Sequence, residues 1–178
     1  MKIQAAADGV KLIGKARTIH IDNVSGVKAE KDLVLSSGDM PAVECVKMIT
    51  LPGEYEVADV LIRGMYDAQK KVLYRVTTGE ITSVIVPSPL KEIGKEAMNE
   101  IGEQIDLLFL TVTDKETLKA AKEIVNDLVP RGLVVVSSLP MPEVSTAVNT
   151  ALQIPEGEIT VKKADLQDDV TLGWYVGV

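Results

Sequence analysis

The chain has 178 residues, of which 46% are hydrophobic and only 3% aromatic. This length suits one domain, residues 1–178, with a core built from aliphatic side chains. The net charge of −7 argues against nucleic-acid binding, which needs a cluster of basic residues. No apolar run approaches the roughly 20 residues that cross a bilayer, and no signal peptide is visible. We therefore expect a cytoplasmic protein with no nucleic-acid partner and no membrane partner.

The first part of the chain is predicted to be β-structure. Residues 2–6, 10–13 and 17–22 lie between turn signals and predict a small antiparallel meander. In the third strand, His20 is expected on the opposite face from its isoleucine neighbours. A polar connection then leads to a buried strand at 32–37, which runs into a loop rich in Gly, Asp and Pro. Loops at the ends of strands are where α/β proteins often place their sites.

The centre of the chain is the stretch 51–65, with the sequence LPGEYEVADVLIRGM. A Pro-Gly turn precedes two short alternations of apolar and polar residues, which predict a pair of strands. Glu54 and Glu56 fall on one face of the first strand. This favours a solvent-facing edge pair over an acid–base pair. Tyr55, between them, is expected to anchor the core.

Beyond residue 88, helical repeats alternate with short apolar runs, which implies crossover connections and partly parallel pairing. The helix at 114–128 is the clearest element, because its apolar residues share one face and Thr113 and Glu116 form a capping-box pattern. Trp174 and Tyr175 could pack the last strand onto a helix or form a subunit contact. The other expected strands are 46–51, 71–77, 81–86, 105–111, 133–136, 158–162 and 170–176, and the other expected helices are 90–101 and 142–152.

The string PGEYEV at 52–57, followed by Ile-Arg-Gly at 62–64, carries a family resemblance. It resembles the metallo-β-lactamase superfamily, most closely its small bacterial and archaeal hydrolases similar to the ascorbate-6-phosphate lactonases. The resemblance implies an α/β fold, an αββα sandwich of two mixed β-sheets flanked by helices, in a compact version that fills residues 1–178. It also implies an ancestral zinc-dependent hydrolase activity.

In that family, an H-x-H-x-D-H loop preceded by serine follows a buried strand and holds one or two zinc ions. The equivalent segment here is 37–43, with the sequence SGDMPAV. Gly, Met and Val stand at the histidine positions, and Ala stands at the aspartate position. By the same alignment, the bridging carboxylate and the last histidine are replaced near Ser88 and Ser138. The candidate pocket at these former metal-site positions consists of Ser37, Gly38, Asp39, Met40, Ser88 and Ser138.

The residue inventory agrees with this interpretation, because the chain contains one histidine, His20, and one cysteine, Cys45. A zinc site needs several nitrogen or sulfur ligands. We therefore assign no catalytic residue, no metal ligand and no cofactor. The leading hypothesis is a non-catalytic protein with a binding, regulatory or structural role, acting alone, as a homo-oligomer or with a protein partner. The alternative is a hydrolase with altered, metal-free chemistry in the former metal cleft.

Overall fold

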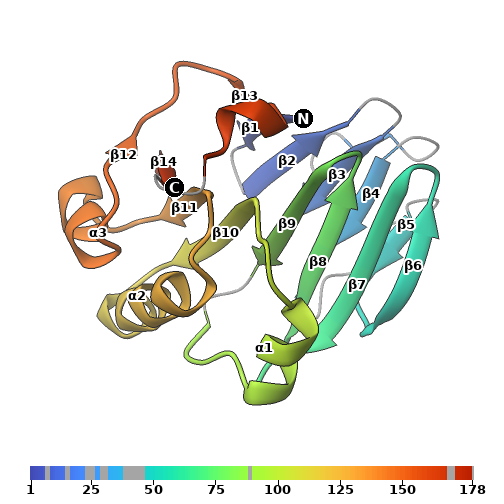
Figure 1. Ribbon diagram of the computed structural model, residues 1–178, viewed down its shortest axis with the longest axis horizontal. Coiled ribbons are helices and arrows are strands. Elements are labelled where there is room, and N and C mark those ends of the chain that lie inside the picture. Colours follow the sequence, from blue (N-terminus) through green and yellow to red (C-terminus); the bar gives the residue numbers. More distant parts are fainter. Residues whose placement is uncertain are drawn as a thin grey trace.

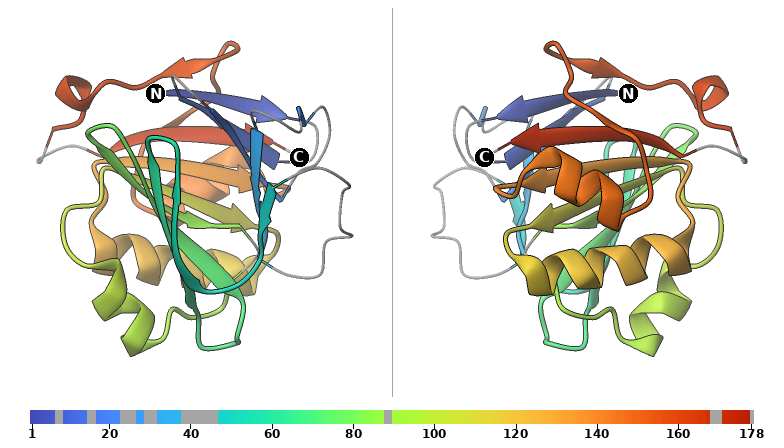
Figure 2. Two further views of the ribbon diagram at one scale, coloured as in Figure 1. Left: turned by 90° about the vertical axis from the view of Figure 1, so that its right-hand side faces the viewer. Right: turned by 90° about the vertical axis from the view of Figure 1, so that its left-hand side faces the viewer.

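The computed structural model describes residues 1–6, 9–14, 17–22, 27–28, 32–37, 47–87, 90–167 and 171–177. Two mixed β-sheets face each other, and helices flank the sandwich (Figures 1 and 2). The expected α/β sandwich is therefore confirmed. In the described ranges, the three α-helices all lie on the outer face of the larger sheet. No helix in these ranges is long and apolar enough to cross a membrane.

The smaller sheet has the strand order β13-β1-β2-β3-β4-β5. The first three strands pair antiparallel, as the meander pattern predicts, and β4 and β5 then continue parallel to β3. The edge strand β13 pairs with β1 from the far end of the chain. The bounds are β1 (Lys2–Ala6), β2 (Gly9–Ile13), β3 (Thr18–Ile21), β4 (Asp32–Leu35), β5 (Lys47–Ile49) and β13 (Ile159–Thr160).

The larger sheet has the order β12-β14-β11-β10-β9-β8-β7-β6. Strands β6 to β9 form an antiparallel meander, whereas β9, β10, β11, β14 and β12 run parallel. The bounds are β6 (Gly53–Val57), β7 (Val60–Tyr66), β8 (Val72–Thr78), β9 (Ile81–Val86), β10 (Leu107–Val112), β11 (Gly132–Ser137), β12 (Leu152–Gln153) and β14 (Leu172–Gly177).

The central stretch forms the hairpin β6–β7, as expected. Ala58 makes the tight turn with a φ of 58°. Gly64 of β7 packs against Leu51 and Pro52, the two residues just before β6. A Cβ atom at Gly64 would lie 2.9 Å from the Leu51 carbonyl oxygen, so this position needs a glycine. Tyr55 packs against the core between the sheets, and Glu54 and Glu56 are both exposed on the edge strand. These expectations for the stretch are confirmed.

Two apolar layers follow from the alternation of side chains along the strands. The first lies between the two sheets. The second lies between the larger sheet and the helices α1 (Lys95–Ile101), α2 (Lys115–Leu128) and α3 (Met141–Ala147). Neighbouring residues of β14 divide between the layers, because Trp174 packs into the first and Tyr175 into the second.

Three sequence-based details are wrong. Helix α2 is capped by Asp114 rather than Thr113, and Thr117 rather than Glu116 completes the capping box. The Asp114 carboxylate accepts the Thr117 amide at 2.9 Å. Helix α1 begins only after Gly94, so the segment from 90 to 94 is not helical. Helix α3 ends at residue 147, because the chain then turns into β12.

Candidate functional site

The carboxyl-end edge of the sandwich is where a site is expected from topology. The parallel strands β9, β10 and β11 all end there, as does β4 of the smaller sheet (Figure 1). Sites in α/β proteins lie beyond the carboxyl ends of parallel strands. The two sheets meet at this edge, since the Val72 amide donates to the Ser37 carbonyl at 3.5 Å. Ser37 and Ser138 both follow strands that end here.

Ser37 is held by Asp22, which follows β3. The Ser37 amide donates to Asp22 Oδ1 at 3.1 Å, and the Ser37 hydroxyl donates to Oδ2 at 3.2 Å. Asp22 adopts a φ of 46°, and its own amide donates to the Leu35 carbonyl. The carboxylate therefore fixes the start of the segment that follows β4. No sequence pattern singled out Asp22 for this task.

Tyr74 connects the two sheets directly beneath this edge. Its hydroxyl donates to the carbonyl oxygens of Ser36 at 2.6 Å and of Ile49 at 2.7 Å. Burial, and next the nearby Asp22 carboxylate, raise the pKa of Tyr74 well above its ordinary value. The phenol therefore stays neutral and acts as a fixed hydrogen-bond donor between β8 and the ends of β4 and β5.

On the larger sheet, hydroxyl groups connect the strand ends to backbone carbonyls. Ser138 Oγ donates to the Thr113 carbonyl at 3.3 Å, and Thr111 Oγ1 donates to the Pro87 carbonyl at 2.9 Å. The Tyr175 hydroxyl donates to the Ser137 carbonyl at 3.1 Å. These neutral bonds position loops, and none of them forms a donor–acceptor relay toward Ser37. Gly38, Asp39, Met40 and Ser88 of the predicted pocket lie outside the described residues.

His20 lies on β3, two residues before Asp22. It faces outward from the smaller sheet, opposite Ile19 and Ile21, as the alternation predicts, and its side chain is 1% exposed. Nε2 bonds to Asp32 Oδ2 at 2.9 Å, and the Lys28 amide donates to the same oxygen at 2.8 Å. Nδ1 is buried without a partner in the described structure. The imidazole is therefore committed to a buried pair between β3 and β4.

The donor set of the described residues does not fit zinc. Within these ranges, no group of three or more His, Cys, Asp or Glu side chains comes together to hold a metal ion. Zinc prefers imidazole and thiolate ligands, and the whole chain has one of each parent residue. The His20 nitrogen that bonds Asp32 lies on the outer face of the smaller sheet. Cys45 lies outside the described residues.

Besides Asp32, two further buried carboxylates were missed by the sequence reasoning. Asp67, in the turn between β7 and β8, accepts the Gln69 and Lys71 amides on Oδ1 at 2.7 Å, while its buried Oδ2 has no partner in the described structure. Asp106, just before β10, is fully buried and ion-paired. Both partnerships depend on turns or on segments far apart in the chain. A single sequence carries no local signal for them.

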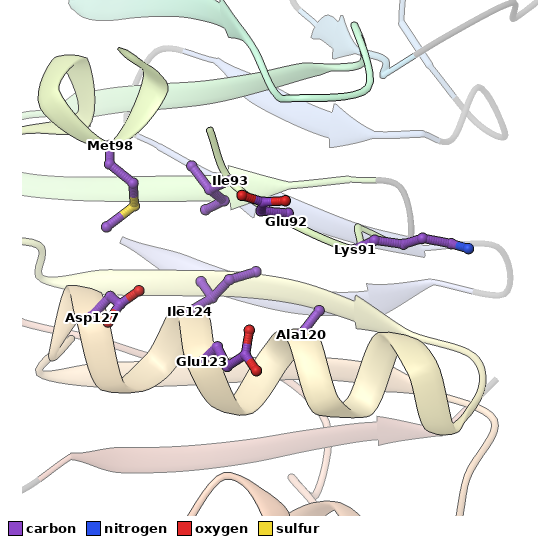
Figure 3. A pocket seen from close by; sticks show the side chains of 8 residues that line it. All are labelled: Lys91, Glu92, Ile93, Met98, Ala120, Glu123, Ile124 and Asp127. Atoms are coloured by element: carbon purple, nitrogen blue, oxygen red, sulfur yellow. The ribbon is translucent and has the colours of Figure 1, made fainter. Parts of the chain in front are cut away.

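A surface groove lies between α2 and the segment that leads into α1 (Figure 3). It has a volume of about 240 Å³. Ile93 and Met98 lie on one side and face Ile124 of α2 (Figure 3). Its rim carries the acidic side chains Glu92, Glu123 and Asp127 together with Lys91, which pairs with Glu116 at 2.8 Å. The groove lies on the helical face of the larger sheet.

Comparisons with known proteins bear on the fold. No family model matches the chain, and no curated protein matches it. Among solved structures, a proposed Zn-dependent hydrolase of the metallo-β-lactamase superfamily from Thermotoga maritima is similar. Its TM-score is 0.76 at 19% identity, over 98% of each chain. The metallo-β-lactamase fold protein YhfI from Bacillus subtilis has a TM-score of 0.61 at 12% identity, over 99% of this chain and 96% of that one.

A proposed metal-dependent hydrolase from Parabacteroides distasonis is also similar. It has a TM-score of 0.60 at 14% identity, over 79% of this chain and 84% of the other. At such identities the likeness shows the fold and not the activity. The architecture implied by the PGEYEV string is thus confirmed by structure, whereas the fate of the activity depends on the residues of this chain.

Proposed function

We propose that this chain, which has the metallo-β-lactamase fold, is a non-catalytic protein with a binding, regulatory or structural role. The supporting observation is the placement of His20, the only imidazole in the sequence. Its Nε2 is bonded to Asp32 on the outer face of the smaller sheet. Zinc hydrolases of this fold class need several imidazole or thiolate ligands around a water-derived nucleophile. This chain has no set of residues that would supply them.

Hydrogen bonds nevertheless hold the backbone in place at the carboxyl-end edge. Asp22 holds Ser37 through two hydrogen bonds, and Tyr74 joins the ends of β4 and β5 to the larger sheet. A scaffold preserved without metal ligands suits the recognition of a small ligand or a protein partner. The replacement of the ligand positions by Gly, Met, Ala and Val also removes polar groups that would be costly to bury without a metal.

The test is a joint measurement of metal content and turnover. We expect the purified protein to contain far less than one zinc ion per chain by elemental analysis. We also expect no hydrolysis above buffer of a lactone, a p-nitrophenyl ester or bis(p-nitrophenyl) phosphate, with or without added Zn²⁺ or Mn²⁺. Stoichiometric zinc together with turnover would overturn the proposal. The C45S variant distinguishes zinc held by a stray thiol from zinc held in a site.

A metal-free hydrolase is the second candidate, and the bond from Ser37 Oγ to Asp22 Oδ2 at 3.2 Å favours it. Against it, Asp22 also accepts the Ser37 amide, as in a loop anchor. A carboxylate is moreover a weak base for a serine hydroxyl without an imidazole between them. This candidate predicts ester hydrolysis that resists EDTA, is lost in S37A and is retained in S138A. Equal rates in S37A and the wild type would exclude it.

A further inference from the structure

The helices leave open the outer face of β6 and of those parts of β7 and β8 that lie beyond α1 (Figure 1). The strand register arranges six side chains there in two rows. Glu54, Arg63 and Arg75 form one row, and Glu56, Leu61 and Thr77 form the other. We call these six residues the open patch. Five of them have at least partly exposed charged or polar groups, and a groove of about 570 Å³ runs over the patch.

An apolar side chain lies at the centre of the open patch. Leu61 and Met65 project from the same face of β7, because they are four residues apart on one strand. Met65 is 3% exposed, since it packs with α1, whereas Leu61 is 54% exposed. Leu61 therefore stays exposed, just beyond the part of β7 that α1 covers. Burial of an exposed leucine in a contact is favourable, because it removes apolar surface from water.

The charges of the open patch are unbalanced within one chain. Arg63 lies directly opposite Arg75 in the β7–β8 register, and like charges in that position repel. Arg63 has ion pairs with Glu100 at 3.4 Å and with Glu54 at 3.7 Å. Arg75 has no carboxylate partner among the described residues, and its buried Nε has no acceptor there. Glu56 likewise has no basic partner in these ranges.

The mixture of signs decides what kind of occupant fits. A small anion near Arg75 would also meet Glu54 and Glu56, and a small cation would meet both arginines. A second copy of the same face offers both signs and another Leu61. Self-complementarity of this kind is the requirement of a two-fold symmetric contact, in which one patch meets itself.

We propose that the open patch is the contact surface of a homodimer, in which Arg75 of each copy pairs with Glu56 of the other. Arg75 and Glu56 occupy opposite corners of the patch, on either side of β7. The two-fold axis lies in the plane between the two faces and is perpendicular to the line from Arg75 to Glu56. It therefore places each Arg75 over the Glu56 of the second copy. The same operation brings the two Leu61 side chains close to the axis, and the two Arg63 side chains as well, with each Arg63 beside the Glu54 of the other copy.

The dimer is independent of the proposed loss of catalysis, because none of the six residues of the open patch takes part in the contacts described at the carboxyl-end edge. Stable dimers bury about 800 Å² on each partner, which exceeds what six side chains supply. We therefore expect a weak dimer whose population rises with protein concentration. Its charge pairs should weaken as salt rises.

The experiment is sedimentation equilibrium of the full chain over a hundredfold range of concentration at low salt. The wild type should dimerise, and R75E and E56R should each weaken the dimer by roughly tenfold or more, because their corners then carry charge of one sign. The double variant R75E/E56R should dimerise again. An equimolar mixture of R75E and E56R should form a heterodimer, since one copy is then all-acidic and the other all-basic at the corners.

The matched controls are K122E and E123R on α2, which make the same charge changes outside the open patch and should leave the dimer intact. A wild type that stays monomeric at every concentration would overturn the proposal, as would singles that associate like the controls or a double variant that remains monomeric. Should R75E fail to fold, E56R changes only an exposed side chain and carries the test. Concentration-dependent protection of the β7 amides in hydrogen exchange of the wild type supports the proposal without any variant, and unchanged exchange contradicts it.

Discussion

The two ends of the parallel strands in the larger sheet satisfy their polar groups in different ways. At the amino end, Asp106 is fully buried and accepts Lys163 Nζ at 2.6 Å, Arg131 Nη1 at 2.9 Å and the Thr82 amide at 2.9 Å. At the carboxyl end, Ser138 and its neighbours use neutral hydroxyl-to-carbonyl bonds. The ion-paired carboxylate Asp106 therefore lies at the edge where α/β proteins do not place their sites, whereas Asp67, in the turn before β8, accepts backbone amides.

The difference teaches that a buried carboxylate is not by itself a sign of a site. Burial alone would raise the pKa of Asp106, but the bonds from Lys163, Thr82 and Arg131 outweigh burial and hold its pKa below the ordinary value. Such saturation leaves no lone pair for a ligand. At the carboxyl-end edge, Asp22 and Tyr74 hold the backbone around the end of β4, while an exposed hydroxyl bond such as that of Ser138 is easily replaced by a bond to a partner.

The largest effect is expected at Asp106. The D106N variant keeps the shape but removes the buried negative charge that pairs with Lys163 and Arg131, so the free energy of unfolding should fall by about 3 kcal/mol. Urea denaturation of D106N beside D127N, an exposed aspartate on α2, measures the difference. Equal stabilities of the two variants would show that the amino-end cluster contributes no more than a surface charge.

The contribution of Asp106 to the stability of the protein should also depend on pH. Because the folded pKa of Asp106 is depressed, its contribution is present above the unfolded pKa of about 4 and is lost as the pH falls through the folded pKa. The stability of the wild type should therefore fall more steeply below pH 4 than that of D106N. Unfolding midpoints measured from pH 6 down to pH 2 check this, and parallel curves would contradict it.

A smaller effect is expected at Tyr74, beneath the carboxyl-end edge. Y74F removes the one hydroxyl hydrogen that the Ser36 and Ile49 carbonyls share, while the Ile49 carbonyl still accepts the Ser36 amide, so the cost should be about 1–2 kcal/mol. Y66F, at a tyrosine that is 41% exposed, is the control and should change little. Should Y66F prove as costly as Y74F, the inter-sheet hydroxyl would not be what holds this edge.

The smallest effect is expected at the strand ends themselves. S138A removes one exposed hydroxyl bond and should cost less than about 0.5 kcal/mol. Its neighbour Ser137 is buried and accepts the Leu139 amide at 3.0 Å, so S137A should cost about 1 kcal/mol. Thermal unfolding of the pair tests the order, and a larger loss in S138A would reverse our view of this edge.

Much of the fold is predictable because its signals are local. Alternation identified the meander and the β6–β7 hairpin, and the helical repeat identified α2. The errors also have local causes: Asp114 was a better cap than Thr113, and Gly94 delayed α1. Helix α3 ends early because the chain goes on to form β12, which pairs with β14. This pairing joins residues about 20 positions apart, so a short stretch of sequence does not predict it.

The candidate site is less predictable, because its contacts join distant segments. The pattern placed Ser37 at the end of a strand over 32–37, whereas the strand ends at Leu35 and Ser37 follows it, and no pattern predicted its anchor Asp22. His20 was correctly placed on one face, yet its pairing with Asp32 required the parallel register of β3 and β4. The assignments of Gly38, Asp39, Met40 and Ser88 stay predictions, because these positions lie outside the described residues.

The pairing of β1 with β13 has a consequence for how the chain folds. Lys2 lies opposite Thr160, so this edge of the smaller sheet closes only after almost the whole chain is available. Long-range strand pairing is slow, because the loop entropy is lost before any contact compensates for it. On the ribosome, β1 can pair early with β2, which is local, while its other edge waits for β13. Docking of β13 should accordingly be a late event, visible as a slow phase in refolding and as early hydrogen exchange in the native state.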